Sequence, residues 1–274
     1  MIDRKPPRLV ATDVDGTLLD DRDAVSPRTV AAITRLVEAG ASFVLVTGRP
    51  PRWIPPVAAA LPDGLVQLCV CANGAVLYDA ADDVVLDAHT LSPDAVRRLA
   101  GLATDLFPGC GLGVERVGTA SEGGADEFRT EPGYVHAWGA HDGGAASREE
   151  LLSRPATKLL VRSPELTSEQ MMSRLGPEVE GLADLTFSHP SGLIEASAPG
   201  VTKATGLAEV ARRLGVTAAE TVAFGDMPND REMLRWAGLG VAMGNAHPEL
   251  AGIADEVTTP HTHDGLAEVL ERWL

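Results

Sequence analysis

In the first part of the chain, hydrophobic residues occur in two patterns: short continuous runs typical of buried strands, and a spacing typical of helices. Residues 8–12 form a short apolar run, and residues 43–46 have the pattern of a strand buried on both faces. Between them, apolar residues recur at helical spacing. Ser26 followed by Pro27 is typical of a helix N-cap with proline in the first turn, and Gly40 marks the expected end. The pattern predicts strand, helix, strand.

A third apolar run, residues 65–71, precedes Asn73-Gly74, a dipeptide that favours a two-residue hairpin turn. Residues 75–78 are therefore expected to return as the antiparallel partner. Beyond Asp82 the alternation weakens and turn-forming residues multiply. The elements expected there are strands at 84–86, 158–161 and 193–196, helices at 92–106 and 168–175, and a Gly-rich stretch at 118–144.

Strong alternation of helices and strands returns in the last part of the chain. The expected elements are helices at 203–214 and 229–236, strands at 221–224 and 239–242, and a final helix ending at residue 274. Such alternation indicates a doubly wound parallel sheet. We therefore expect an α/β fold with a Rossmann-like core formed by residues 1–82 and 196–274, and an α+β domain inserted at 83–195.

Composition limits the classes of protein to consider. The 274 residues contain no apolar run near 18 residues and no secretory signal, so a cytoplasmic protein that binds no membrane is expected. A net charge of −16 without a basic cluster argues against nucleic-acid binding. Cys69 and Cys71 are expected to be buried, reduced thiols. An anionic substrate still fits if the site supplies its own positive charge, because distant charges are screened.

Polar residues directly after the predicted strands are the candidates for chemistry, because ligands of doubly wound sheets lie beyond the carboxyl ends of the strands. Asp13 and Asp15 leave the first strand on the same side, and Gly16 allows a sharp turn. Both acids can face one ligand. A solvated Asp-Gly turn is the alternative, whereas Thr17 and the preceding strand argue against a calcium loop.

Three further groups follow strands or begin helices. Thr47, Gly48 and Arg49 follow the strand at 43–46 and offer a hydroxyl, a flexible backbone and a guanidinium to a phosphate, although an ordinary loop explains this group better when it is taken alone. Lys203 falls in the first turn of a helix, where the dipole disfavours a cation. Such a lysine suggests pairing with a bound anion, with a solvated lysine as the alternative.

Asp226 and Asp230 follow the strand at 221–224 and can approach one cation. Mg²⁺ prefers oxygen ligands and usually keeps several waters. Asp13, Asp226 and a backbone carbonyl would therefore suffice to hold it.

These groups occur in the order of the four motifs of the haloacid dehalogenase-like phosphatases, and the sequence resembles that family. The matching residues are Asp13-Val14-Asp15-Gly16-Thr17, Thr47, Lys203, Gly225-Asp226 and Asn229-Asp230. The insert, with Asn73-Gly74-Ala75 before it and residues 240–246 near the end, is similar to the Cof-type subgroup.

The resemblance implies a division of roles. Asp13 would be the nucleophile that becomes an aspartyl phosphate, and Asp15 the acid that protonates the leaving oxygen and then activates water. The implied Mg²⁺ site comprises Asp13, Asp15 through its backbone carbonyl, Asp226 and Asp230. The implied phosphate site comprises Asp13, Gly16, Thr47, Gly48, Arg49, Asn73, Lys203 and Asn229. Of these residues, Asp13, Asp15, Thr47 and Lys203 would take part in catalysis.

The implied function is Mg²⁺-dependent hydrolysis of small phosphorylated metabolites such as sugar phosphates. Two alternatives stay open: a phosphosugar mutase on the same scaffold, and a non-catalytic protein that binds phosphometabolites. The oligomeric state, monomer or dimer, is also open. In the insert, His136, Trp138 and His141 could touch a substrate, although exposed loop side chains of these types are common.

Overall fold

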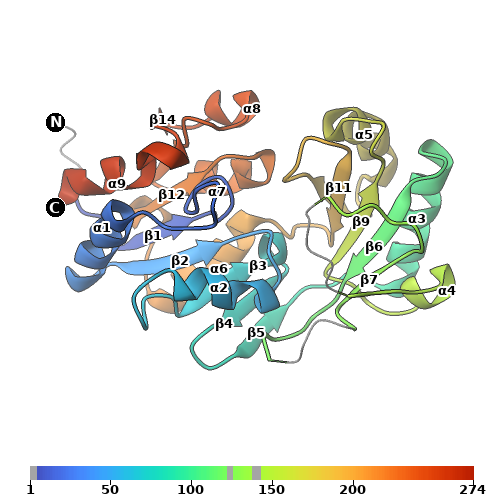
Figure 1. The fold of residues 1–274 in the computed structure, drawn as a ribbon, viewed down its shortest axis with the longest axis horizontal. Helices are drawn as coiled ribbons and strands as arrows, with labels where there is room; N and C mark the ends of the chain where they lie inside the picture. The colour runs from blue at the N-terminus through green and yellow to red at the C-terminus, as the bar shows by residue number, and fades with distance from the viewer. Residues whose placement is uncertain (1–4, 122–125, 138–142) are drawn as a thin grey trace.

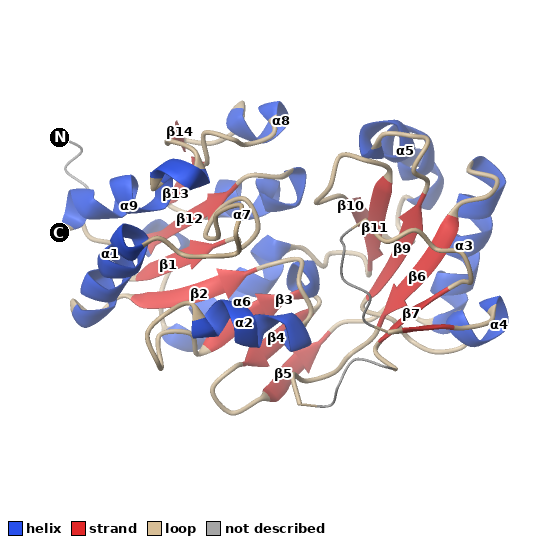
Figure 2. Cartoon of the chain, in the orientation of Figure 1, coloured by secondary structure: helices blue, strands red, loops and turns tan. Residues whose placement is uncertain are grey.

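The protein consists of two lobes, seen side by side in Figure 1. The structure is a computed structural model that describes residues 5–121, 126–137 and 143–274. The larger lobe combines the first and last parts of the chain, and the smaller lobe is formed by the middle part. Each lobe contains one sheet with helices packed on it, as Figure 2 shows.

The larger lobe is built on an eight-stranded sheet with strand order β14-β13-β12-β1-β2-β3-β4-β5. Neighbours are parallel from β14 to β3, and β4 and β5 add an antiparallel edge. The strands are β1 (Leu9–Thr12), β2 (Ser42–Val46), β3 (Leu68–Cys71), β4 (Val76–Asp79), β5 (Val84–Ala88), β12 (Thr221–Gly225), β13 (Leu239–Ala242) and β14 (Glu256–Val257).

Helices cover both faces of this sheet. One face carries α1 (Pro27–Glu38), α2 (Ile54–Ala59) and α9 (Gly265–Leu270), and the other carries α6 (Lys203–Leu214), α7 (Arg231–Trp236) and α8 (Pro248–Ala251). Along β1, Val10 packs into the first cluster whereas Leu9 and Ala11 pack into the second. Burial on both faces explains the continuous apolar runs, and the predicted α/β fold class is confirmed.

The smaller lobe has a six-stranded sheet with order β10-β11-β9-β6-β7-β8. Its strands are β6 (Gly111–Glu115), β7 (Phe128–Thr130), β8 (Gly144–Ala145), β9 (Lys158–Arg162), β10 (Asp184–Thr186) and β11 (Leu193–Ser197), and its helices are α3 (Pro93–Leu106), α4 (Arg148–Leu151) and α5 (Ser168–Leu175). Helices α3 and α5 pack on Leu159, Val161 and Ile194. Because strand side chains alternate, Lys158, Leu160 and Glu195 face the opposite side.

The lobe boundaries differ from the prediction at both junctions. The strand expected at 84–86 as part of the insert is β5, which pairs with β4 in the larger sheet. At the other junction, β11 continues through Ala196 to Ser197 in the smaller sheet, paired with β10. The larger sheet thus extends past residue 82, and the smaller sheet extends past residue 195. A strand's own residues do not encode its pairing partner, so the hydrophobic pattern could not predict either boundary.

The turn at Asn73-Gly74 also differs from the expected two-residue hairpin. Strands β3 and β4 are antiparallel, but a 3₁₀ turn, Ala72–Gly74, widens their connection, and Asn73 has a φ of 58°. Helix α6 starts against this turn: a Cβ on Gly74 would lie 2.0 Å from the carbonyl oxygen of Thr202, its N-cap residue. Glycine here lets the helix start approach the sheet edge.

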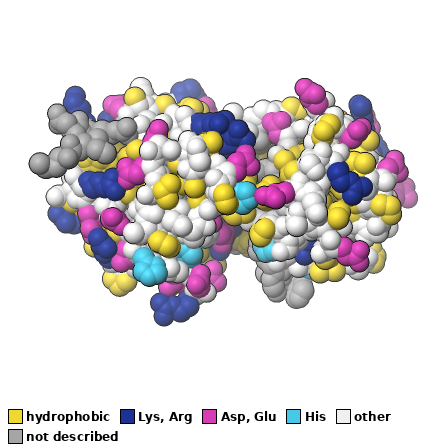
Figure 3. All heavy atoms as spheres, turned by 90° about the horizontal axis from the view of Figure 1, so that it is seen from above, with side chains coloured by type: hydrophobic (Ala, Val, Ile, Leu, Met, Phe, Trp, Pro, Cys, Tyr) yellow, Lys and Arg dark blue, Asp and Glu magenta, His cyan; other side chains and the backbone are white. Residues whose placement is uncertain are grey.

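None of the helices in the described part of the chain combines the length and apolarity that a membrane crossing requires. On the face shown in Figure 3, acidic side chains are interspersed with basic and hydrophobic ones over both lobes, with a waist between them.

Candidate active site

Two buried carboxylates lie side by side at the carboxyl edge of the larger sheet. Asp13 follows β1 and Asp226 follows β12, and these strands pair with Thr12 opposite Phe224. The backbone N–H of Asp13 donates to the Phe224 carbonyl at 3.0 Å, which fixes the two strand ends together. Parallel pairing therefore brings together acids that are far apart in the sequence.

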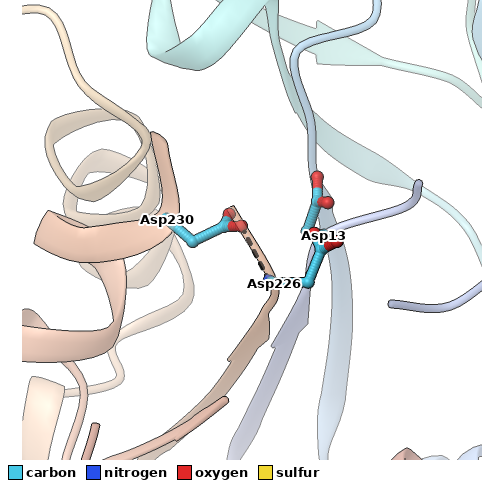
Figure 4. Close-up of side chains that lie close together, drawn as sticks. All are labelled: Asp13, Asp226 and Asp230. Carbon is cyan, nitrogen blue, oxygen red and sulfur yellow. Dashed lines mark hydrogen bonds between the residues drawn. The ribbon is translucent and has the colours of Figure 1, made fainter. Parts of the chain in front are cut away.

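Asp230 completes a buried acidic group with Asp13 and Asp226, shown in Figure 4. One oxygen from each of the three carboxylates lies within 4.8 Å of the others. Both oxygens of Asp230 already accept hydrogen bonds: Oδ1 from Lys203, and Oδ2 from the backbone N–H groups of Asp226, at 3.0 Å, and Met227, at 3.1 Å. Asp230 thus holds the loop that carries Asp226.

Lys203 is the cation of this group. It is the first residue of α6 and is fully buried, and its Nζ donates to Asp13 Oδ1 and Asp230 Oδ1, each at 2.6 Å. Burial opposes the charged form, but the carboxylates of Asp13 and Asp230 outweigh it and raise the pKa of Lys203. The lysine that is poorly placed for its helix is therefore well placed for these anions.

The positive charge of Lys203 does not compensate for the negative charges that Asp13, Asp226 and Asp230 would carry if all were ionised. Burial raises the pKa of Asp13 to about 7, against the lowering effect of Lys203. Burial, followed by the charges of Asp13 and Asp230, raises the pKa of Asp226 to about 9. Ionising both groups near neutral pH thus requires positive charge beyond Lys203.

The residues around Asp226 fit a hard cation. Its Oδ1 is buried without a hydrogen-bond partner in the described part of the chain, and unpartnered buried carboxylate oxygens suit Mg²⁺. Gly16, with a φ of 72°, leaves space beside it, since a Cβ there would lie 2.3 Å from Asp226 Oδ2. Asn245, which the sequence interpretation did not assign to the site, donates its Nδ2 to the Gly16 carbonyl at 2.9 Å.

Asp15 faces a different group. Its side chain is 61% exposed, and the Arg49 guanidinium binds both of its oxygens, with Nε 2.9 Å from Oδ2. The buried Thr47 hydroxyl accepts the backbone N–H of Arg49 at 3.0 Å. The loop after β2 therefore positions a guanidinium directly over the loop after β1.

A second polar network joins the two lobes. Asn73 Nδ2 donates to Glu195 of β11 at 3.1 Å, and Asn229 Nδ2 donates to Asn73 Oδ1 at 3.1 Å. Lys158 of β9 donates to the Gly48 carbonyl at 2.7 Å and also to Glu195. Lys158 and Glu195 were not predicted as site residues. The available signal was a charged residue within each apolar strand, and Lys158 is one of only three lysines.

A cavity of about 540 Å³ lies between the lobes. Of the predicted site residues, those that border it are Asp13, Asp15, Gly48, Arg49 and Asn229. The others, Gly16, Thr47, Asn73, Lys203, Asp226 and Asp230, are not part of its lining. His136 also borders the cavity, whereas Trp138 and His141 lie outside the described residues.

Comparisons with known proteins agree with this geometry. A family model described as haloacid dehalogenase-like hydrolase matches residues 10–270. The chain is 32% identical to the HMP-PP phosphatase of Serratia proteamaculans, with 97% of this chain and 95% of that protein covered. It is 30% identical to a 5-amino-6-(5-phospho-D-ribitylamino)uracil phosphatase of Bacillus subtilis, with 97% of each covered. A solved phosphatase of this superfamily from Bacteroides thetaiotaomicron has a TM-score of 0.81 at 24% identity, covering 100% of this chain and 97% of that one.

The fold and the acidic strand-end site define an α/β enzyme with an inserted lobe. The chain belongs to the haloacid dehalogenase-like hydrolases, and within them it is a phosphatase, an enzyme that hydrolyses phosphoric monoesters. The resemblance predicted from the ordered motifs, including the Cof-type subgroup, is confirmed.

Replacing Lys203 by Met should strongly destabilise the protein, because it leaves the Asp13 and Asp230 carboxylates buried without their cation. We expect the free energy of unfolding at pH 8 to fall by about 3–5 kcal/mol, and by less at pH 5, where Asp13 can take up a proton. Urea unfolding measures both values. Lys5→Met, at an exposed position, is the control; equal losses in the two variants would contradict the assigned role.

The Asp226→Asn variant should become more stable than the wild type as pH rises, with a chelator present. The folded-state pKa of Asp226 is about 9, above its ordinary 3.8. Between those values the folded wild type binds more protons than the unfolded chain, so its stability falls with rising pH. The stability difference in favour of the variant should grow from about pH 4 to about pH 9 and then level off. Thermal unfolding across this range measures it, and a difference independent of pH would contradict the raised pKa.

Proposed function

We propose that the protein hydrolyses small phosphorylated metabolites in a Mg²⁺-dependent reaction that passes through an aspartyl phosphate on Asp13. The observation that carries this proposal is the position of Asp13. It is the one member of the buried acidic group, defined by Asp13, Asp226 and Asp230, that also borders the cavity between the lobes. A substrate phosphate in that cavity can therefore reach its carboxylate.

Asp13 and Asp226, together with the backbone carbonyl of Asp15, are the groups that would hold Mg²⁺. Asp226 supports this with its unpartnered buried oxygen. Asp230 acts as a positioning residue in the proposal, because both of its oxygens already accept N–H groups. When bound, the cation supplies positive charge that neutralises the phosphate and the carboxylates.

In the first half-reaction an Asp13 oxygen attacks phosphorus, the Asp13 O–P bond forms, and the ester P–O bond breaks. The leaving oxygen takes a proton from Asp15. Lys203 holds Asp13 by Oδ1 and keeps one N–H beyond those given to Asp13 and Asp230. We propose that this N–H donates to a phosphate oxygen when substrate is bound, which is the role predicted for Lys203, and that Thr47 contacts the phosphate from the loop after β2.

In the second half-reaction Asp15 takes a proton from water, whose oxygen attacks phosphorus. The Asp13 O–P bond breaks and inorganic phosphate is released. Asp15 is bound to Arg49 in the structure, so it must exchange this partner to reach the leaving oxygen. An incoming phosphate is a suitable competitor for the guanidinium, since Arg binds phosphate and carboxylate in the same bidentate way.

The substrate class follows from the site and from the relatives. A cavity of about 540 Å³ accommodates a small metabolite and not a protein segment. The two similar phosphatases are named for small phosphorylated compounds. We propose the same class for this protein.

Replacing Asp13 by Asn should abolish turnover, because an amide is a poor nucleophile. Phosphate release from acetyl phosphate with Mg²⁺ should fall by at least about a thousandfold. Rapid quenching of the wild type should trap a hydroxylamine-sensitive phosphoryl group on the peptide that contains Asp13. Asp63→Asn, at an exposed loop position, is the matched control. Full activity of the Asp13→Asn protein would exclude this nucleophile.

Mg²⁺ affinity should rise with pH, because the cation competes with the protons held at the raised pKa values of Asp13, about 7, and Asp226, about 9. The increase in Tm caused by Mg²⁺ should therefore be small at pH 6 and larger at each step up to pH 9. Asp226→Asn should lose most of this increase. A Mg²⁺ effect of equal size at pH 6 and pH 9 would argue against metal binding at these carboxylates.

A further inference from the structure

Aromatic side chains from both lobes border the cavity. Trp53 comes from the 3₁₀ turn Pro51–Trp53 of the larger lobe, and Phe128, Tyr134 and His136 come from the smaller lobe. The last three form a cluster with ring centroids 6.4 Å apart for Phe128 and Tyr134, 5.8 Å for Phe128 and His136, and 5.1 Å for Tyr134 and His136. The sheet face opposite α3 and α5 thus presents rings to the cavity.

The charged side chains at this end of the cavity are directed at one another. The Arg52 guanidinium binds both oxygens of Glu115, at 2.6 and 3.0 Å, and its Cζ lies 5.5 Å from the Trp53 ring centroid and 6.0 Å from that of Phe128. Lys158 is paired with Glu195. The remaining surface is largely apolar, with Leu19, Val57, Phe128, Leu160 and Met227 among its residues.

One polar group in the aromatic cluster lacks a partner. The Tyr134 side chain is buried, with 8% of the residue exposed, and its hydroxyl makes no hydrogen bond in the described part of the chain. Buried hydroxyls are usually bonded. A ligand that offers one acceptor or donor to Tyr134 and otherwise presents apolar faces would satisfy this hydroxyl.

We infer that the substrates are phosphate monoesters whose leaving group carries a planar heteroaromatic ring, bound against Phe128 and Tyr134. The inference rests on the proposed function, since it names the leaving group of that reaction. A ring of this type makes stacked or edge-to-face contacts with aromatic side chains, and it carries few polar atoms. A sugar carries a hydroxyl on nearly every carbon, and each one that lost water without finding a partner would weaken binding.

The wild-type test compares three phosphate compounds with Mg²⁺ present. They are pyridoxal 5′-phosphate, which has a heteroaromatic ring, glucose 6-phosphate, which has a sugar, and acetyl phosphate, which has neither. We expect kcat/KM for pyridoxal 5′-phosphate to exceed that for glucose 6-phosphate by at least about tenfold. Equal or better turnover of glucose 6-phosphate would overturn the inference and leave the phosphatase proposal intact.

Variants of the aromatic residues test whether the ring of the substrate binds against them. In Phe128→Leu the ratio of kcat/KM for pyridoxal 5′-phosphate to that for acetyl phosphate should fall by about tenfold. Phe107→Leu is the matched control, because Phe107 is a buried ring packed on the α3 side of the smaller sheet, and it should leave the ratio unchanged. Tyr134→Phe, which removes only the hydroxyl, should raise KM for pyridoxal 5′-phosphate several-fold. An unchanged ratio in Phe128→Leu would overturn the inference.

A different result would show that the proposed phosphatase function itself is wrong. In that case acetyl phosphate would not be hydrolysed with Mg²⁺, whichever ring is present. The ring inference is then decided by calorimetric binding of pyridoxine, the free ring alcohol, against glucose. Tighter binding of pyridoxine that weakens in Phe128→Leu supports the inference, and equal or absent binding of the two compounds overturns it.

Discussion

The buried ion pairs of Lys203 hold together the carboxyl edge of the larger sheet. Its Nζ joins the loop after β1, through Asp13, to the start of α7, through Asp230, while its backbone begins α6. Removing three charged groups from water is costly, and their mutual attraction offsets this cost only in good geometry. The approach of α6 to the sheet edge, which Gly74 permits, is what provides that geometry. The same contacts therefore fix both the geometry of the site and the position of α6.

The contacts between the lobes are of a different kind. Around the cavity they include a buried guanidinium–carboxylate pair, Arg52 with Glu115, and the hydrogen bonds that Gly48 and Asn73 form with the smaller lobe. The main hydrophobic cluster of each lobe lies within that lobe. Polar contacts can be exchanged for water at small net cost, whereas separating apolar surfaces cannot. Such an interface would let the inserted lobe separate from the larger lobe without exposing the main hydrophobic cluster of either.

The sequence predicted the larger lobe better than the smaller one, for physical reasons. Buried parallel strands and capped helices leave local signals, as Ser26 before α1 and Thr202 before α6 show. Strands β6, β7 and β10 were missed, because they are short or contain glycine and take their stability from pairing partners. In the site, acids that follow strands were predictable from position. The hydrogen bonds that Lys158 and Glu195 form with the larger lobe were not predictable, because they depend on how the two lobes face each other.

In the proposed reaction, the acidic group also connects metal binding to the ionisation of the nucleophile. With a pKa of about 7 for Asp13 and about 9 for Asp226, Asp13 is about half protonated and Asp226 is largely protonated at neutral pH, although Lys203 is paired with Asp13. A protonated carboxyl neither attacks phosphorus nor binds a cation well. Positive charge added beside Asp226 displaces protons from both carboxyls, because each charge raises the pKa of the other. In the proposed reaction, the burial that destabilises the free carboxylates therefore makes the ionised, reactive form of Asp13 more abundant when the cation is bound.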